Sequence, residues 1–211
     1  MTGRILIDLF TTLDGVSQAP GGPEEDPEDG FAFGGWQAPL TGEIDGGQIF
    51  AGIRSTDALL LGRRTYDIFA SYWPVQFETS DSEIARIFEG IPKYVASRGE
   101  PELSWRDSHL LGRDLAAEIA TLRERHNETH VIGSIDFART LVAQGLFDQL
   151  NLWVYPIVLG PGKRLFPADG PAAGLKLLAP PEASAKGAVL LRYGPGDPVT
   201  TGDMTPEGTE G

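Results

Sequence analysis

The sequence predicts an α/β fold with a mixed central sheet flanked by helices. Over most of the chain, short apolar runs alternate with helical patterns, which is typical of parallel strands joined by helices. The last third instead contains strand-like runs with no helix between them. The 211 residues show no internal repeat and no second apolar core. We therefore expect one domain, residues 1–194, and a disordered tail, residues 195–211, rich in Gly, Pro, Thr and acid.

Each element is predicted from its hydrophobic pattern and its boundary residues. Ser82 and Asp114 are typical helix caps, Gly145 is a typical helix stop, and Pro74 is expected to end the helix before it. The last two strands are expected to pair antiparallel. The expected strands are 4–10, 58–61, 93–96, 131–132, a long one from 148 to 159, 175–178 and 188–193, with 103–111 extended. The expected helices are 48–55, 65–72, 83–89, one that follows Asp114, and 136–144.

A long loop, about residues 16–47, interrupts this alternation. It is rich in Gly, Pro and acid, and it carries Phe31, Phe33 and Trp36. Loops of this length in a compact domain are usually functional or disordered. The aromatic residues suggest docking over a ligand or a neighbouring subunit. For residues 20–29, an acidic and solvated excursion is an equal alternative.

Composition excludes several classes of function. The formal net charge is −13, which argues against a nucleic-acid partner because phosphate binding needs a basic face. There is no cysteine, so disulfides and thiolate chemistry are excluded, and a reducing cytoplasm is the expected location. No apolar run is long enough to span a membrane, and no leader is evident. The three histidines are scattered, which favours surface or strand-end positions over a metal site.

Three apolar runs end in residues suited to an anion. The first ends in Gly62, Arg63, Arg64 and Thr65 and then becomes helical; the second ends in 97–99, Ser-Arg-Gly; the third ends in 133–134, Gly-Ser, before a helix. A helix start presents free N–H groups and a partial positive charge. Ordinary turns with solvated arginines are the alternative. If the three strands are parallel, their ends meet at one sheet edge, where ligands bind in α/β folds.

With these motifs in view, the chain resembles the dihydrofolate-reductase-like superfamily. Within it, the closest resemblance is to the C-terminal reductase domain of bacterial riboflavin biosynthesis and its small stand-alone relatives. The resemblance extends from residue 4 to 193. Its most specific segments are 12–15 (Thr-Leu-Asp-Gly), 61–66 (Leu-Gly-Arg-Arg-Thr-Tyr), and 146–148 (Leu-Phe-Asp) through 159–166. It implies a three-layer α/β/α fold.

The resemblance also implies NADPH as cofactor and assigns residues to it. The pyrophosphate and part of the 2′-phosphate region would be held by Gly62, Arg63, Arg64 and Thr65. Ser97 and Arg98 would hold the 2′-phosphate of the adenosine. Gly133 and Ser134 would also face the pyrophosphate, at the start of their helix.

The substrate side is assigned by position in the same way. Asp14, Gly15, Ser17 and Trp36 would lie near the reacting ring, with Trp153 stacking on a flat heterocycle or, alternatively, packing within the sheet. Water or a side chain, Asp14 or Tyr155, would supply the proton.

The chain departs from the family in two ways. A carboxylate pairs with the pterin in dihydrofolate reductases; here Glu43 and Asp45 lie in that region without a matching motif. There is also no room for the zinc deaminase domain that often accompanies riboflavin reductases. The sequence therefore predicts an NADPH-dependent reductase of a small heterocyclic or conjugated C=N or C=O substrate, acting as a homodimer. A non-catalytic nucleotide-binding protein or a flavin-binding protein is the alternative.

Overall fold

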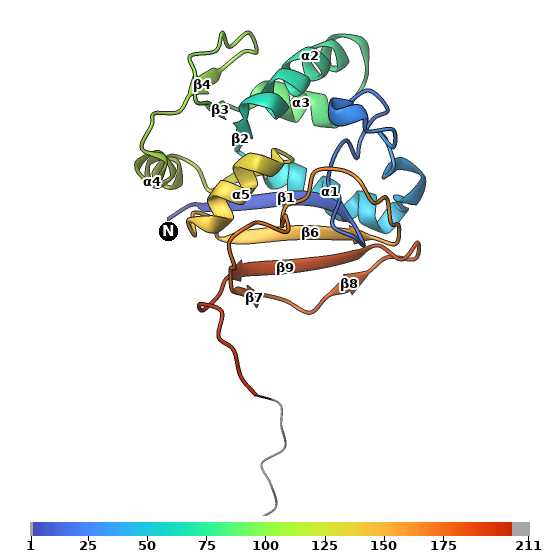
Figure 1. The fold of residues 1–211 in the computed structure, drawn as a ribbon. Coiled ribbons are helices and arrows are strands. Elements are labelled where there is room, and N and C mark those ends of the chain that lie inside the picture. The colour runs from blue at the N-terminus through green and yellow to red at the C-terminus, as the bar shows by residue number, and fades with distance from the viewer. Residues whose placement is uncertain (1, 204–211) are drawn as a thin grey trace, which may run out of the picture.

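The computed structural model describes residues 2–203, apart from the side chains of residues 43–46. Within that range, helices cover both faces of a nine-stranded mixed sheet (Figure 1). The strands are β1 (Arg4–Thr12), β2 (Ala58–Gly62), β3 (Lys93–Ala96), β4 (Ser108–Leu110), β5 (Glu128–Ile132), β6 (Gln149–Tyr155), β7 (Leu175–Leu177), β8 (Glu182–Ala183) and β9 (Val189–Pro195). The helices are α1 (Glu43–Ser55), α2 (Arg63–Thr79), α3 (Glu83–Gly90), α4 (Leu115–Arg125) and α5 (Ile135–Ala143), with 3-10 turns at Glu28–Gly30 and Ala38–Leu40.

The sheet has the order β4-β3-β2-β5-β1-β6-β9-β7, and β8 pairs with β9. The first six strands are parallel, whereas β9 runs antiparallel to β6 and to β7. This confirms the mixed sheet and the antiparallel pairing of the two final expected strands, which correspond to β7 and β9. The ends of β2, β3 and β5 lie side by side, as expected for three parallel neighbours. The three strand-end motifs therefore share one edge of the sheet.

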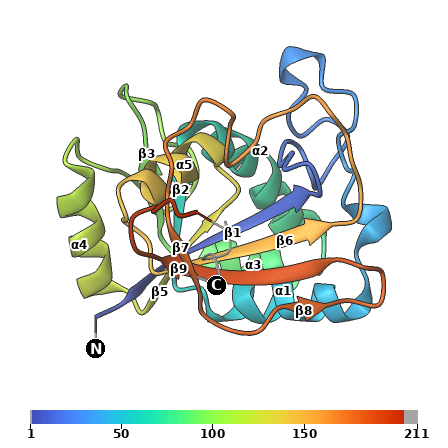
Figure 2. The ribbon, with the colours of Figure 1, turned by 60° about the horizontal axis from the view of Figure 1, so that its bottom comes forward.

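Alternating residues of the strands fill two apolar layers. Ile5, Ile7 and Leu60 point toward α4 and α5, while Leu59 and Leu61 point toward α2 and α3. Figure 2 shows β1, β6 and β9 side by side, with α5 on one side of the sheet and α1 on the other. The central strands are thus buried on both faces, which is why they read as continuous apolar runs.

Pro74 does not end its helix, so that prediction was wrong. α2 runs from Arg63 through Pro74 to Thr79. A proline in a helix removes one backbone hydrogen bond and crowds the preceding turn. Here the surrounding turns are held by aromatic packing, because the ring of Trp73 lies 5.1 Å from that of Phe88 on α3 and 6.0 Å from that of Phe69.

Other boundaries also differ from the sequence-based expectation. α1 begins at Glu43, five positions earlier than predicted, so the preceding loop is shorter. β6 ends at Tyr155 and does not continue to 159, because Pro156 has no N–H and Ile157 N bonds back to Tyr155 O at 2.8 Å. The expected extended segment 103–111 contains only the short β4, and β8 falls in a connection predicted to be loose.

The end of the chain is described only in part. β9 reaches Pro195, and residues 196–203 are exposed and form no helix or strand. Residues 204–211 of the expected tail lie outside the described residues, as do the side chains of Glu43 and Asp45. The division into a domain at 1–194 and a tail remains a prediction.

Asp148 connects the start of β1 to α4. Its carboxylate accepts a hydrogen bond from the backbone N–H of Ile5 at 2.8 Å and pairs with the guanidinium of Arg123 at 2.9 Å. The backbone N–H of Asp148 also donates to the Ile5 carbonyl. This residue belongs to the Leu-Phe-Asp segment of the family resemblance, and the structure gives that segment a structural role.

We predict that Asp148→Ala lowers the free energy of unfolding by about 1–3 kcal/mol, because the Ile5 N–H and the Arg123 guanidinium lose a charged acceptor. Urea denaturation followed by circular dichroism measures the change. Asp169→Ala, at an exposed loop position, is the matched control and is expected to stay within about 0.5 kcal/mol of the unsubstituted protein. Equal stability of the two variants would contradict the role of Asp148.

Candidate functional site

A cleft of about 1850 Å³ opens over the carboxyl ends of β2, β3 and β5 and continues beneath α1. The predicted anion-binding residues all line it. They are Gly62, Arg63, Arg64, Thr65, Ser97, Arg98, Gly133 and Ser134. The topology therefore brings together segments that lie up to 72 residues apart in the chain, as the Gly62–Ser134 contact shows.

Two helices begin at this cleft, and neither has a side-chain cap. α2 follows Gly62 and α5 follows Ser134, and no side chain accepts from their first N–H groups. In contrast, α3 is capped by Ser82 and α4 by Asp114. Uncapped N–H groups need another acceptor, and a phosphate is a good one because the helix dipole adds to its attraction.

The two helix starts are held close together by Gly62 and Ser134. The N–H of Gly62 donates to Ser134 Oγ at 2.9 Å, so this N–H is not available to a ligand. A Cβ on Gly62 would lie 3.1 Å from Phe137 Cβ and 3.3 Å from Ser134 Cβ, closer than most real contacts. Ser134 itself has a φ of 58°, a left-handed conformation that costs a non-glycine residue free energy. Glycine at 62 thus permits the close approach of α2 and α5.

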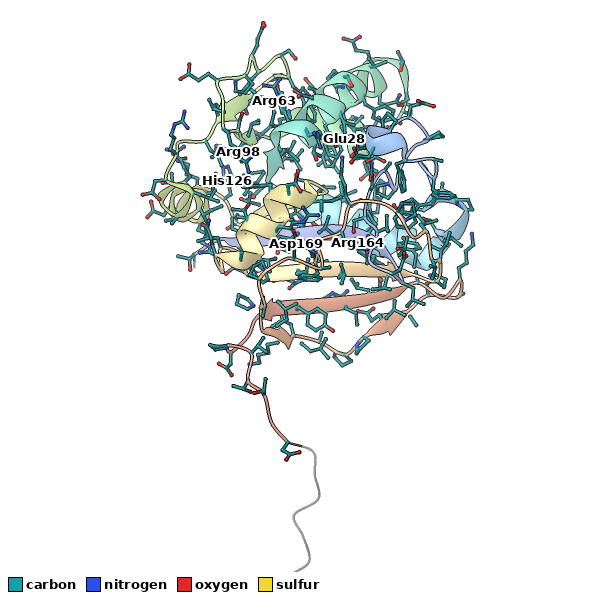
Figure 3. The ribbon with its side chains drawn as sticks, viewed as in Figure 1. Glu28, Arg63, Arg98, His126, Arg164 and Asp169 are labelled. Carbon is teal, nitrogen blue, oxygen red and sulfur yellow. The ribbon has the colours of Figure 1, made fainter. Side chains whose placement is uncertain are left out.

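The arginines of the cleft fall into two groups. Arg63 pairs with Asp67 on its own helix, and Arg64 pairs with Glu28 of the long loop. Figure 3 labels Arg63, Arg98 and Glu28. Arg98 and Arg113 are exposed at the cleft and have no hydrogen bond or ion pair to any residue that the structure describes. Arg113 was missed by sequence reasoning, because its loop before α4 carries no strand-end pattern. The two free guanidiniums are available for an anion.

The acidic part of the long loop packs on the protein body. Glu28 contacts both Arg64 and Lys163, and Asp26 also pairs with Lys163. Glu25 accepts from the N–H groups of Gly21 and Gly22, and burial raises the pKa of its carboxyl despite these bonds. The segment is therefore tied to the protein body at the cleft, although most of residues 21–30 are exposed to solvent.

Only two of the residues assigned to the substrate side line the cleft. Ser17 does, with its Oγ buried and without a hydrogen-bond partner among the described residues, and Trp153 does, at the end of β6. Trp36 does not; its Nε1 donates to the Gln18 carbonyl and its ring packs edge-on against Tyr155. Gly15, with a φ of 85°, lines a separate small hollow.

The two suggested proton donors also lie away from the cleft. The Asp14 carboxylate accepts from the N–H groups of Leu159 and Gly160 and from the Thr12 hydroxyl. Burial opposes ionisation, but these hydrogen bonds outweigh it and lower the pKa of Asp14, so near neutral pH its carboxyl is ionised and holds no proton to donate. Tyr155 is fully buried, and its hydroxyl accepts from Gln37. Both side chains are thus engaged away from the cleft, and their role as proton donors stays a prediction.

The structure adds a polar group that sequence reasoning did not find. His130, only 2% exposed, lies inside β5 and not at the surface or a strand end, so that expectation was wrong. Its Nδ1 is 2.6 Å from the carboxylate of Asp8 in β1. Both residues line the cleft beneath α1. In the sequence, the one available signal is a single Asp within the apolar run Ile5–Leu9. That Asp lies next to a histidine only because β1 pairs with β5.

Residues 4–179 match the model of the RibD C-terminal domain. The chain belongs to the RibD C-terminal domain family. Among curated proteins, it is 25% identical to the uncharacterized protein YyaP of Bacillus subtilis over 169 residues, which is 77% of this chain and 80% of that protein.

Solved structures share the fold. A putative riboflavin biosynthesis protein from Shewanella sp. PV-4 matches with a TM-score of 0.62 and 20% identity, over 92% of this chain and 99% of that one. Dihydrofolate reductase from Enterococcus faecalis, complexed with NADP(H), matches with a TM-score of 0.55 and 14% identity, over 93% and 99%. The three-layer dihydrofolate-reductase-like fold expected from the sequence is confirmed, and the family is one of reductases.

No helix among the described residues is both long and apolar enough to cross a membrane. They also contain no group of three or more His, Asp or Glu side chains arranged to hold a metal ion.

We predict that Glu28→Gln loosens the loop over the cleft, because Arg64 and Lys163 lose a charged partner. Hydrogen exchange of residues 20–30 measures the change, and faster exchange is expected with little effect on the sheet. Glu24→Gln, an exposed position with no ion pair to a described residue, is the control. The assignment fails if exchange in the loop is the same in both variants.

Proposed function

We propose that this protein is an NADPH-dependent reductase that transfers hydride to a small heterocyclic or conjugated C=N or C=O substrate, such as a pterin- or pyrimidine-like ring. The observation that carries the proposal is the pair of uncapped helix starts at the edge of the sheet. A dinucleotide has two adjacent phosphates, and two helix N-termini side by side match them. The similar reductase of E. faecalis forms a complex with NADP(H), which supports the assignment.

The residues of the cleft fit the other parts of such a cofactor. Free N–H groups of α2 and α5, next to Thr65 and Gly133, would hold the pyrophosphate. Ser97 and Arg98, joined by Arg113, would hold the 2′-phosphate, since both guanidiniums lack a partner among the described residues. Arg64 would contribute charge while it keeps the loop in place through Glu28.

The nicotinamide end would lie where the cleft turns beneath α1. Gly133 N donates to the Asp8 carbonyl at 3.2 Å, so the phosphate-binding turn leads directly to the middle of β1. The cofactor supplies the hydride in this class of chemistry. The chain binds and orients the two rings, and the packed loop of residues 20–30 excludes water from them.

We predict that the protein binds NADPH more tightly than NADH, and that Arg98→Ala removes most of this preference. Charge-assisted contacts to a phosphate contribute about 1.5–3 kcal/mol, which is a loss of roughly 10- to 100-fold in NADPH affinity. Isothermal titration calorimetry with both nucleotides measures it. Arg113→Ala is expected to act in the same direction.

Arg125→Ala, an exposed arginine on α4 away from the cleft, is the matched control and should bind NADPH as the unsubstituted protein does. If Arg98→Ala and Arg125→Ala bind NADPH equally, the 2′-phosphate assignment is wrong. Binding of neither nucleotide to the unsubstituted protein would overturn the proposed function and favour the flavin-binding or non-catalytic alternative.

We also propose a homodimer. Of the loop aromatics, Trp36 and Phe31 pack within the chain, whereas Phe33 stays exposed. Large apolar side chains remain exposed near the ends of β1 and β6, at Leu13, Val158 and Phe166. We predict a dimer mass by light scattering, and a shift toward monomer in Val158→Asp. A monomer mass at every protein concentration would contradict the dimer.

A further inference from the structure

The pair of Asp8 and His130 is the centre of a polar network on the floor of the cleft. Each oxygen of the Asp8 carboxylate already accepts one hydrogen bond, from His130 at 2.6 Å and from Asn151 Nδ2 at 2.8 Å. Asn151 in turn accepts from Gln149 Nε2 at 2.7 Å, and Gln149 accepts from Arg4. The network spans β5, β1 and β6, so it fixes the carboxylate in one orientation.

Burial of this network costs free energy, and the strands could pair without it. Placing an ion pair inside a sheet carries a desolvation penalty that apolar side chains of similar volume avoid. His130 Nε2 is buried without a hydrogen-bond partner among the described residues; the nearest acid oxygen, on Glu128, is 3.6 Å away. Polar groups retained at such a cost, in a cleft, are typical of binding and catalytic sites.

The Asp8 carboxylate lines the cleft next to the proposed cofactor end. The Asp8 side chain is 19% exposed, whereas the side chain of its partner His130 is 2% exposed. Phe10 and Trp153, paired across β1 and β6, follow it along the cleft. Its own backbone carbonyl is bonded to Gly133. A ring bound beside Asp8 therefore meets the phosphate-binding turn at one end and aromatic walls at the other.

The acidic groups at the pair are Asp8 and Glu128, and the basic side chains beside them already have acidic partners. On the strands, Asp8 and Glu128 face His130, and Arg4 is the basic group beside Glu128 at 3.6 Å. Arg192 is occupied by Glu182. The described cleft-lining residues of α1 carry no charge; they are Gln48, Ile49, Ala51, Gly52, Ile53 and Ser55.

We infer that Asp8 is the substrate-contacting carboxylate of this cleft, oriented by Asn151 and by the positioning residue His130, and that it takes the N–H edge of a flat, basic nitrogen ring or amidine. A carboxylate has about four acceptor positions, and two remain for the ligand. Amidine-type N–H pairs match them with charge as well as geometry. The inference deepens the proposed function and rests on it for the reaction, but the binding site is tested separately.

The state of His130 gives the inference a second readout. Burial opposes protonation of the imidazole, but the hydrogen bond and charge of Asp8, with a smaller effect of Glu128, outweigh it and raise the pKa of His130. A cation bound at Asp8 offsets the negative charge that stabilises the protonated imidazole. It therefore lowers the pKa of His130 and favours release of the imidazolium proton.

The experiment uses benzamidine as the cationic probe and benzamide as its neutral counterpart, each titrated into the full chain by calorimetry. Benzamidine is expected to bind at least about tenfold more tightly than benzamide. Asp8→Asn is expected to remove that difference. Asp107→Asn, in an exposed Asp–His pair at the start of β4 with a 2.8 Å contact, is the matched control and should behave as the unsubstituted protein.

Nuclear magnetic resonance of the histidine rings in the unsubstituted protein covers the case in which Asp8→Asn does not fold. Saturating benzamidine should lower the pKa of His130 and leave the ring signals of His109 unmoved. The inference is overturned if benzamidine does not move the His130 signals, or if Asp8→Asn binds benzamidine as well as the control does. Failure of NADPH to bind would instead count against the proposed function, since the benzamidine result does not depend on it.

Discussion

The contact between Gly62 and Ser134 is the constraint on which the rest of the site depends. It joins the end of β2 to the end of β5, and the hydrogen bond from the Gly62 N–H uses the serine hydroxyl that could otherwise cap α5. Because no Cβ stands between them, two helix starts converge on the same space. The free N–H groups of the two helix starts give this end of the cleft a partial positive charge, although the net charge of the protein is −13.

Local sequence patterns predicted this edge of the sheet well. Each of the three motifs is a short apolar run that ends in Gly, Ser or Arg, and parallel pairing then requires their ends to coincide. The capping signals at Ser82 and Asp114 were correct for the same reason, since a cap depends only on its neighbours.

Several differences from the sequence-based expectation depend on contacts between distant segments. Pro74 stays helical because Trp73 packs on Phe88 of another helix. The proton-donor assignments of Asp14 and Tyr155 stay predictions, and the hydrogen-bond partners of these residues at Gly160 and Gln37 come from other parts of the chain. Asp8 and His130 are 122 residues apart, and neither sits in a motif. A single sequence contains no signal for such a pair until strand order and register are known.

The ion pairs between the acidic loop and the cleft limit how related chains can differ. Asp26 and Glu28 come from the segment after β1, whereas Lys163, 137 residues after Asp26, comes from the segment after β6, and Arg64 comes from α2. Reversing one of these charges alone would leave like charges in contact. We therefore expect the acidic and basic positions to change together among relatives, so that a neutral loop accompanies a neutral residue at position 163.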